Sequence, residues 1–222
     1  MLVSVIIPTY NNGDNLDKTL ESVYKQSHKD IEIIVVNDCS TDSTEMVIQK
    51  HLGRIKYLAL PENKGGSFAR NKGFAISSGE YVAFLDADDI WKPSFIEKQL
   101  ESIKSNDSVA VYCHAEDELG NTLGGRHQGN FIDELLLGKA DIVSTSALFI
   151  RRDVFISVGG FDVAFQRHQD LEFIIRIMKS GFVAVNAESL FYKINSGSPS
   201  FYKAMSGIKL FWTKFDADIK AL

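Results

Sequence analysis

Three carboxylates, Asp86, Asp88 and Asp89, follow directly on an apolar run at residues 81–85. Such a run is typical of a central strand covered on both faces, and open α/β sheets bind ligands at the carboxyl ends of their strands. Asp86 and Asp88 are two residues apart, so both can turn toward one cation where the strand bends into a loop. Mg²⁺ and Mn²⁺ prefer such oxygen ligands, and the ion would also grip a diphosphate. The alternative is that Asp88 and Asp89 only cap a helix starting near Pro93.

Polar residues also end the first two apolar runs of the chain. Thr9, Tyr10 and Asn11 come after the first run, and Asp38 comes after the second. In a parallel sheet these ends meet at one edge. There Tyr10 is suited to stack on a nucleotide base, and Asp38 is suited to accept a hydrogen bond from a base N–H. The plainer alternatives are that Tyr10 covers the sheet edge and that Asp38 serves in a turn.

Arg70 and the segment 167–172 add to the candidate chemistry. The guanidinium of Arg70 suits phosphate oxygens, although as a surface ion pair it would contribute little. Residues 167–172 hold two carboxylates, Asp170 and Glu172, where a helix is expected to begin. Asp170 is therefore either a functional acid or the N-cap of that helix, or both.

The composition excludes several classes of function. The chain has 222 residues, is 45% hydrophobic and 24% charged, and carries a net charge of −5. These values predict a folded domain with a sizeable core, and the acidic balance argues against nucleic acid as the main partner. Cys39 and Cys113 lie far apart, which fits a reducing compartment. With no apolar run of ~18 residues and no signal-peptide pattern, the chain is expected to be cytoplasmic, or cytoplasmic and attached to a membrane face.

Strands and helices alternate in the first half. Apolar runs predict strands at residues 2–7, 31–36, 55–60 and 81–85, and helical spacing predicts helices at 16–24, 42–52, 67–76 and from 93 onward. This alternation is typical of a parallel sheet with right-handed crossovers, so the fold class is α/β. Asp42 and Glu45 have the spacing of a capping box at the start of the second helix.

The second half has a different pattern. Strands are expected at residues 109–114 and 142–150 and within 183–192, and helices at 152–158 and from about Asp170 to a stop at Gly181. The polar, glycine-rich segment 116–130 is expected to be a mobile loop. Near the C-terminus, apolar residues recur in steps of four and three: Phe201, Met205, Ile208, Trp212, Phe215, Ile219 and Leu222. This one-face helix either docks on the core, lies in a membrane interface or contacts a partner helix.

Common nucleotide fingerprints are absent. The first strand is followed by no Gly-x-Gly-x-x-Gly, and the chain has no Gly-x-x-x-x-Gly-Lys-Ser/Thr and no Gly-x-Ser-x-Gly. Nicotinamide cofactors, P-loop chemistry and α/β serine hydrolysis are therefore disfavoured. The ordered motifs instead resemble those of a family 2 glycosyltransferase with the GT-A fold. They are SVIIPTYN (4–11), EIIVVND (32–38), NKG (63–65), ARNKG (69–73), SGEY (78–81), FLDADD (84–89), GGFD (159–162) and QDLEF (169–173).

The resemblance implies one GT-A-like domain over residues 1–222, with a Rossmann-type nucleotide-binding sheet flanked by helices. A nucleotide-sugar-binding half at 1–105 would be followed by a smaller acceptor-side and catalytic-base half at 106–195 and a C-terminal amphipathic helix at 199–222. The implied substrate-binding residues are Pro8, Thr9, Tyr10 and Asn11 near the base, Asp38 bonded to it, Arg70 near the diphosphate, and Asp86 and Ala87 near the ribose or sugar. Asp88 would bind Mn²⁺ or Mg²⁺, and Asp170 would be the catalytic general base.

The implied reaction is the inverting transfer of one sugar from a nucleotide-sugar, a UDP-sugar, to a glycan or lipid-linked glycan in cell-surface polysaccharide biosynthesis. A carboxylate takes the acceptor's hydroxyl proton, and a metal neutralises the leaving diphosphate. Two positions depart from the family pattern, since Asn37 and Gln169 stand where acids are frequent. The alternatives are a non-catalytic nucleotide-sugar-binding subunit and a sugar-phosphate nucleotidyltransferase, which would want a glycine-rich basic loop at residues 9–14.

Overall fold

The first half forms a parallel sheet, as predicted. The computed structural model describes residues 1–124, 127–140, 142–194 and 209–222. Four parallel strands lie in the order β3-β2-β1-β4: β3 (Lys56–Ala59), β2 (Ile31–Asn37), β1 (Val3–Thr9) and β4 (Tyr81–Phe84). β1 lies between β2 and β4, so the chain order reverses at β1 and β4. Crevices for ligands form at such a switch point, outside the carboxyl ends of the strands.

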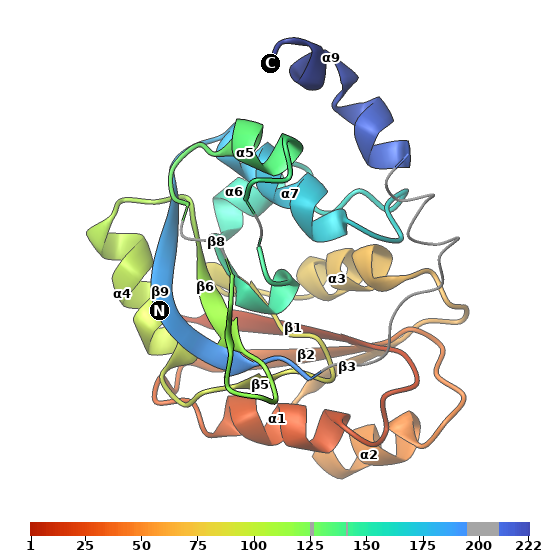
Figure 1. The fold of residues 1–222 in the computed structure, drawn as a ribbon. Coiled ribbons are helices and arrows are strands. Elements are labelled where there is room, and N and C mark those ends of the chain that lie inside the picture. The colour runs from red at the N-terminus through yellow and green to blue at the C-terminus, as the bar shows by residue number, and fades with distance from the viewer. Residues whose placement is uncertain (125–126, 141, 195–208) are drawn as a thin grey trace.

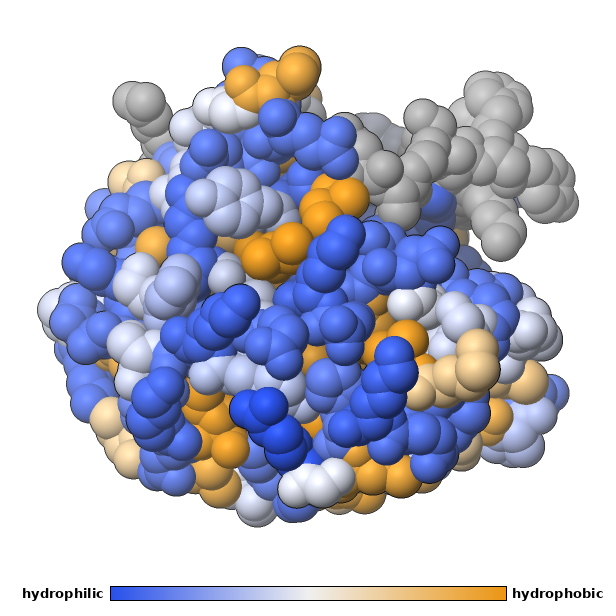
Figure 2. All heavy atoms as spheres, turned by 90° about the horizontal axis from the view of Figure 1, so that it is seen from below, coloured by the Kyte–Doolittle hydropathy of each residue, from blue (hydrophilic) through white to orange (hydrophobic). Residues whose placement is uncertain are grey.

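Helices cover both faces of these strands (Figure 1). α1 (Leu16–Tyr24) and α2 (Thr44–His51) lie on one face, and α3 (Gly66–Ala75) lies on the other. The apolar stripe of α1 is buried, as its spacing predicts. Seen from below Figure 1, the molecule shows a mainly hydrophilic surface with smaller apolar groups (Figure 2). α4 (Phe95–Ser105) begins two residues after Pro93.

Gly73 lets α3 lie close to the sheet. A Cβ at this position would come within 2.5 Å of an Ile6 methyl carbon on β1. Gly73→Ala is therefore expected to destabilise the fold by about 1–3 kcal/mol, because the overpacked contact must push helix and sheet apart. Gly53→Ala is the control, since a Cβ at Gly53 meets nothing within 4 Å. Urea unfolding measures both, and equal midpoints for the two variants would contradict the packing argument.

The capping box expected at Asp42 and Glu45 is wrong. Ser43 is the N-cap residue of α2, and its side chain makes no capping hydrogen bond. Glu45 instead accepts a short hydrogen bond from the Tyr57 hydroxyl on β3. Asp42 accepts a hydrogen bond from the Gly13 N–H at 3.1 Å. The Tyr57 hydroxyl thus draws Glu45 away from the cap. Asp42 accepts from the Thr44 N–H at the start of α2 at 3.0 Å and also ties the loop after β1 to the loop after β2.

The second half extends the same sheet with mixed strand directions. The order across the described residues is β3-β2-β1-β4-β8-β6-β9-β5, and β7 pairs with β6. The added strands are β8 (Leu148–Arg151), β6 (Ala110–Glu116), β9 (Val183–Tyr192), β5 (Ile90–Trp91) and β7 (Thr122–Leu123). β8 runs antiparallel to both β4 and β6. Only part of the strand expected at 142–150 forms, because a 3₁₀ turn, η1 (Thr145–Ala147), comes first.

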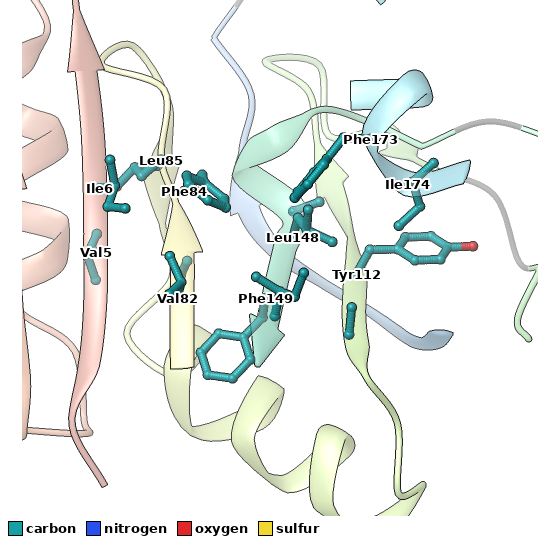
Figure 3. Close-up of a cluster of buried hydrophobic side chains, with 14 of the residues drawn as sticks. Val5, Ile6, Val82, Phe84, Leu85, Tyr112, Leu148, Phe149, Phe173 and Ile174 are labelled. Atoms are coloured by element: carbon teal, nitrogen blue, oxygen red, sulfur yellow. The ribbon is translucent and has the colours of Figure 1, made fainter. Parts of the chain in front are cut away.

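Two helices follow β8, and the second of them carries Asp170. These are α6 (Arg152–Ser157) and α7 (Gln169–Met178), near their predicted places. Phe173 and Ile174 of α7 are fully buried, and Figure 3 shows them beside Leu148 of β8 and Tyr112 of β6. This packing fixes α7 against the sheet. A short helix, α5 (Ile132–Leu136), also forms within the second half, outside the predicted elements, although its buried residues Ile132, Leu135 and Leu136 have helical spacing.

The C-terminal segment docks on the protein's own core where it is described. Residues 209–214 are helical, and α9 (Asp216–Lys220) follows after a break at Phe215. Phe211 and Phe215 are buried, whereas Trp212 is 47% exposed. The apolar stripe expected to include Trp212 is therefore rotated. The expected stripe residues Phe201, Met205 and Ile208 lie outside the described residues.

Ion pairs reinforce this docking. The Lys214 ammonium lies 2.6 Å from an Asp162 oxygen and 2.8 Å from a Glu172 oxygen. Lys179 on α7's C-terminal side pairs with Asp218 of α9 at 2.7 Å. These contacts join the end of the chain to the helix that carries Asp170. No helix in the described part of the chain combines the length and apolar character needed to cross a membrane.

Candidate active site

A cavity of about 220 Å³ opens at the carboxyl ends of β1, β2 and β4. This is the switch point of the strand order. Most of the predicted substrate-binding and metal residues line it together. The lining residues are Pro8, Thr9, Tyr10, Asn12, Asp38, Gly66, Ala69, Arg70, Asp86, Ala87, Asp88 and Lys193.

Asp38 is buried at the end of β2 and organises the next loop. Its two carboxylate oxygens accept hydrogen bonds from the N–H groups of Lys64 and Gly65, each at 2.8 Å. Its own N–H donates to the Thr9 carbonyl at 2.8 Å. Gly65 has a φ of +87°, which a glycine adopts without strain. Asp38 therefore has a structural role as well as its place in the cavity, and its remaining lone pairs are free to accept from a ligand.

Of the residues after β1, Tyr10 and Asn12 line the cavity, whereas Asn11 contacts the loop after β2. Tyr10 lines the cavity and is 49% exposed, so its ring is open to a stacking partner. Asn11 is not among the lining residues, and its side-chain oxygen accepts from the Thr41 N–H at 2.8 Å. Its φ of +51° is one that asparagine tolerates. Asn11 thus joins the loops after β1 and β2, while the next residue, Asn12, reaches the cavity lining.

Arg70 is 4% exposed, which rules out the surface ion pair. Its Nη2 donates to Asp86 at 2.5 Å. Its Nε and Nη1, like the Thr9 hydroxyl, are buried without a hydrogen-bond partner among the described residues. Burial by itself would raise the pKa of Asp86, but the charges of Arg70 and Lys193 hold that pKa below its ordinary value. Buried donors without a protein partner, on residues that line a cavity, call for an explanation such as a polar ligand, and a guanidinium suits phosphate oxygens.

Asp88 has no hydrogen-bond or ion-pair partner among the described residues, although it is only 8% exposed and lines the cavity. The described residues also contain no cluster of three or more His, Cys, Asp or Glu side chains able to hold a metal. A cation here would take one or two carboxylates from the protein and the rest of its ligands from phosphate and water. Mg²⁺ commonly binds nucleotides in this way.

Asp89 supports the acidic loop through a backbone contact. The alternative that Asp88 and Asp89 only cap α4 is wrong. β5 lies between these acids and α4, whose N-cap residue is Ser94. Asp89 is fully buried and accepts from the Ile194 N–H at 3.3 Å. Burial and the nearby Asp86 charge raise the pKa of Asp89 to about 7. Its carboxylate thus links the acidic loop to the residues that follow β9.

Asp170 lies in the first turn of α7 and accepts from the Leu171 N–H at 2.9 Å. The expected N-cap role is wrong, because His168, with a φ of +56°, is the cap residue. Burial raises the pKa of Asp170, the Arg70 charge lowers it, and the Asp86 charge raises it. Arg70 and Asp86, which line the cavity, thus act on the charge of Asp170. Residues 166–170 line a separate concavity of about 380 Å³.

Glu172, the other acid of this turn, is committed to structure. It is fully buried, and its two oxygens accept from Arg176 Nε at 2.5 Å and Nη2 at 2.7 Å. Lys214 adds a third contact at 2.8 Å. These contacts occupy both oxygens of the Glu172 carboxylate. Asp170 is therefore the available acid on this turn.

Sequence reasoning missed several lining residues, and Lys193 is the most consequential. Gly66 and Ala69 belong to α3 and reach the cavity only because that helix lies close to the sheet. Lys193 follows β9 and reaches the cavity because Ile194 is tied to Asp89, more than a hundred residues earlier. No local pattern marks such a residue, since only the pairing of distant strands brings it there.

Known proteins share both sequence and fold with this chain. Residues 4–167 match the profile of Glycosyl transferase family 2. The amylovoran biosynthesis glycosyltransferase AmsB of Erwinia amylovora is 32% identical over 197 residues, covering 81% of this chain and 64% of AmsB. S. aureus TarS 1–349 in complex with UDP-GlcNAc has a TM-score of 0.77 at 21% identity, covering 90% of this chain and 60% of that chain.

The mannosyltransferase PcManGT from Pyrobaculum calidifontis, in complex with GDP-Man and Mn²⁺, has a TM-score of 0.68 at 19% identity. The likeness covers 91% of this chain and 59% of that one. The chain thus spans less than two thirds of the length of each of these three proteins. The structural likenesses confirm the expected GT-A fold. The match over residues 4–167 covers well over half of the sequence, so the chain belongs to glycosyl transferase family 2.

Proposed function

We propose that this chain transfers one sugar, with inversion, from a UDP-sugar to a glycan or lipid-linked glycan acceptor during cell-surface polysaccharide biosynthesis. The observation that carries the proposal is one cavity lined by both Arg70 and Asp88, where the Arg70 Nε and Nη1 and the Asp88 carboxylate have no hydrogen-bond partner among the described residues. A cation-binding acid beside a phosphate-binding guanidinium is what a metal–diphosphate pair requires. The neighbouring TarS structure holds UDP-GlcNAc, which supports a uridine nucleotide as donor.

The donor would lie across the strand ends. Tyr10 would stack on the base, and Asp38 would accept a hydrogen bond from it beside Pro8 and Thr9. Arg70, whose Nε and Nη1 have no hydrogen-bond partner among the described residues, would bind the diphosphate. Asp86 and Ala87 would contact the ribose or the sugar. The Arg70–Asp86 ion pair holds both side chains in place before the donor arrives, so little ordering cost remains on binding.

Asp88 would hold Mn²⁺ or Mg²⁺, with Asp86 as the neighbouring carboxylate. The donor set fits, because both are oxygen ligands and Asp88 has no competing partner among the described residues. When bound, such an ion would neutralise the negative charge that develops on the leaving diphosphate. The PcManGT structure contains Mn²⁺, which supports a metal in this family of folds.

Asp170 would act as the general base. Its carboxylate takes the proton of the acceptor hydroxyl as that oxygen bonds to the anomeric carbon. The bond from this carbon to the diphosphate oxygen breaks in the same displacement, so the anomeric configuration inverts and no protein nucleophile is needed. A pKa raised by burial makes Asp170 a stronger proton acceptor than an ordinary aspartate. The concavity at residues 166–170 is the place for the acceptor.

The proposed class of acceptor is supported by the relatives, since AmsB is named for amylovoran biosynthesis. A lipid-linked acceptor would bring the chain to the inner face of a membrane, and the exposed Trp212 and Leu222 are the side chains for a peripheral contact there. The two unpaired cysteines fit the reducing cytoplasm proposed for this step.

Thermal shift with a panel of sugar nucleotides tests donor binding. A true donor at ~100 times its dissociation constant is expected to add roughly 2.7 kcal/mol of stability in the presence of Mn²⁺. Uridine nucleotides should shift the melting temperature more than guanosine nucleotides, and chelation should reduce the shift. A panel in which no sugar nucleotide moves the melting temperature contradicts the proposed function.

A further inference from the structure

Lys193 brings a second cation into the cavity from the end of β9. It lines the cavity together with Asp86 and Asp88, and its side chain is 28% exposed. The backbone on both sides is anchored. The Lys193 N–H donates to the Glu116 carbonyl at 2.9 Å, and the next N–H donates to the Asp89 carboxylate at 3.3 Å. The Lys193 side chain therefore extends from a backbone position that is fixed beside the acidic loop.

The Lys193 ammonium is not committed to a protein acceptor. Its nearest carboxylate oxygen, Oδ2 of Asp89, lies 3.7 Å away, which is an ion-pair distance but too long for a hydrogen bond. No other acceptor of this ammonium occurs among the described residues. Three N–H donors are thus available to a ligand in the cavity. Lys92 shows the contrast, because its ammonium lies 2.7 Å from a Glu116 oxygen.

The charges that line the cavity indicate a phosphate-binding role for Lys193. Among the residues that line it, three carboxylates, Asp38, Asp86 and Asp88, share the cavity with two side-chain cations, Arg70 and Lys193. One Arg70 nitrogen is already held by Asp86, so Arg70 alone has limited capacity for the oxygens of a diphosphate. A lysine ammonium is a compact charge that binds phosphate well. Lys193 also lowers the pKa of both Asp86 and Asp89, which shows that its charge reaches these groups.

We propose that Lys193 binds the diphosphate of the donor and holds the nucleoside diphosphate after the sugar has left. This inference rests on the proposed function, because it needs a nucleoside diphosphate in the cavity. Lys193 would act beside Arg70 as a second, metal-independent cation. Its contribution should appear in the affinity for UDP and be absent from the affinity for uridine, which lacks phosphate.

Calorimetric titration of the full chain with UDP and with uridine, in Mn²⁺, tests the proposal. Lys193→Met is expected to weaken UDP binding at least roughly tenfold, as loss of a charge-assisted hydrogen bond does, and to leave uridine binding within about twofold. Lys193→Arg should recover most of the UDP affinity. Lys92→Met is the matched control, since Lys92 is 27% exposed and lies beside β9 but does not line the cavity. Its UDP affinity should equal that of the unaltered protein.

The outcomes separate the lysine from the proposed function. If the unaltered protein binds UDP and Lys193→Met binds it equally well, only the Lys193 assignment is overturned. An equal loss of UDP and uridine binding would also overturn it, because that pattern reports a collapse of the loop around Asp89 and not a phosphate contact. If the unaltered protein binds neither UDP nor GDP, the proposed function fails, and the diphosphate role fails with it.

Discussion

Asp170→Asn is expected to abolish sugar transfer while leaving donor binding in place. Asparagine keeps the size of the side chain and the acceptor oxygen that receives the Leu171 N–H. It cannot take a proton from the acceptor hydroxyl, a contribution worth about 10²–10⁴-fold in rate. The turnover number should therefore fall by that factor, and the thermal shift with the donor should remain. The measurement is the steady-state rate of UDP release in the presence of acceptor.

The pH dependence of transfer gives a second view of this side chain. Because burial raises the pKa of Asp170, the active carboxylate form is lost as the pH falls through a value above the ordinary one near 4. The rate should therefore decline on the acidic side at a higher pH than an exposed aspartate would give. Asp170→Asn should remove this limb. Undiminished transfer by the variant, or an unchanged acidic limb, would contradict the assignment of Asp170 as base.

Glu172→Gln provides the contrast on the same helix turn. This change leaves Arg176 and Lys214 facing a neutral amide in a fully buried place. Breaking a buried ion pair typically costs about 3–5 kcal/mol, so the variant should melt at a lower temperature. Below that temperature it should still transfer sugar with the acidic limb of Asp170. A rate loss as large as that of Asp170→Asn, in folded protein, would make Glu172 the better base.

Asp88→Asn is expected to remove the metal dependence of donor binding. Asp88 faces the cavity without a partner among the described residues, so its charge is available to a cation and is not needed for packing. Loss of the ion removes several kcal/mol of stabilisation of the leaving diphosphate, and the specificity constant should fall roughly 10²-fold or more. Donor binding should then be the same with Mn²⁺ and with a chelator.

Asp89→Asn is the matched control within the same acidic run. Its amide oxygen can still accept the Ile194 N–H, so the loop should keep its shape. Metal-dependent donor binding should persist in this variant, with a change in stability only. If Asp89→Asn removes the Mn²⁺ effect and Asp88→Asn does not, the metal ligand is assigned to the wrong acid.

Much of the nucleotide-binding half is predictable because its signals are local. The apolar runs of β1, β2 and β4 and the polar residues after them are contiguous in sequence. Parallel pairing then forces their carboxyl ends to one edge. Pro8, Asp38 and Asp88 therefore meet as expected, and α3 adds Arg70.

The sequence-based predictions fail where a contact with a distant part of the chain determines the local structure. β5 is two residues long and exists only because Ile90 and Trp91 pair with β9. Glu45 leaves its capping place for the Tyr57 hydroxyl on the neighbouring strand. Lys193 enters the cavity from the other end of the sheet. None of these contacts has a local pattern, since each depends on how strands far apart in the chain come together.

The most direct test of the account is anomalous X-ray scattering at the manganese edge from crystals grown with UDP and Mn²⁺. We expect one manganese peak beside Asp88, with the diphosphate between it and Arg70 and the uracil against Tyr10 and Asp38. A manganese peak or a nucleotide bound away from this cavity, such as in the concavity of about 640 Å³ between Glu80 and Arg151 at the opposite end of β4, would contradict the claim that these strand ends hold the donor.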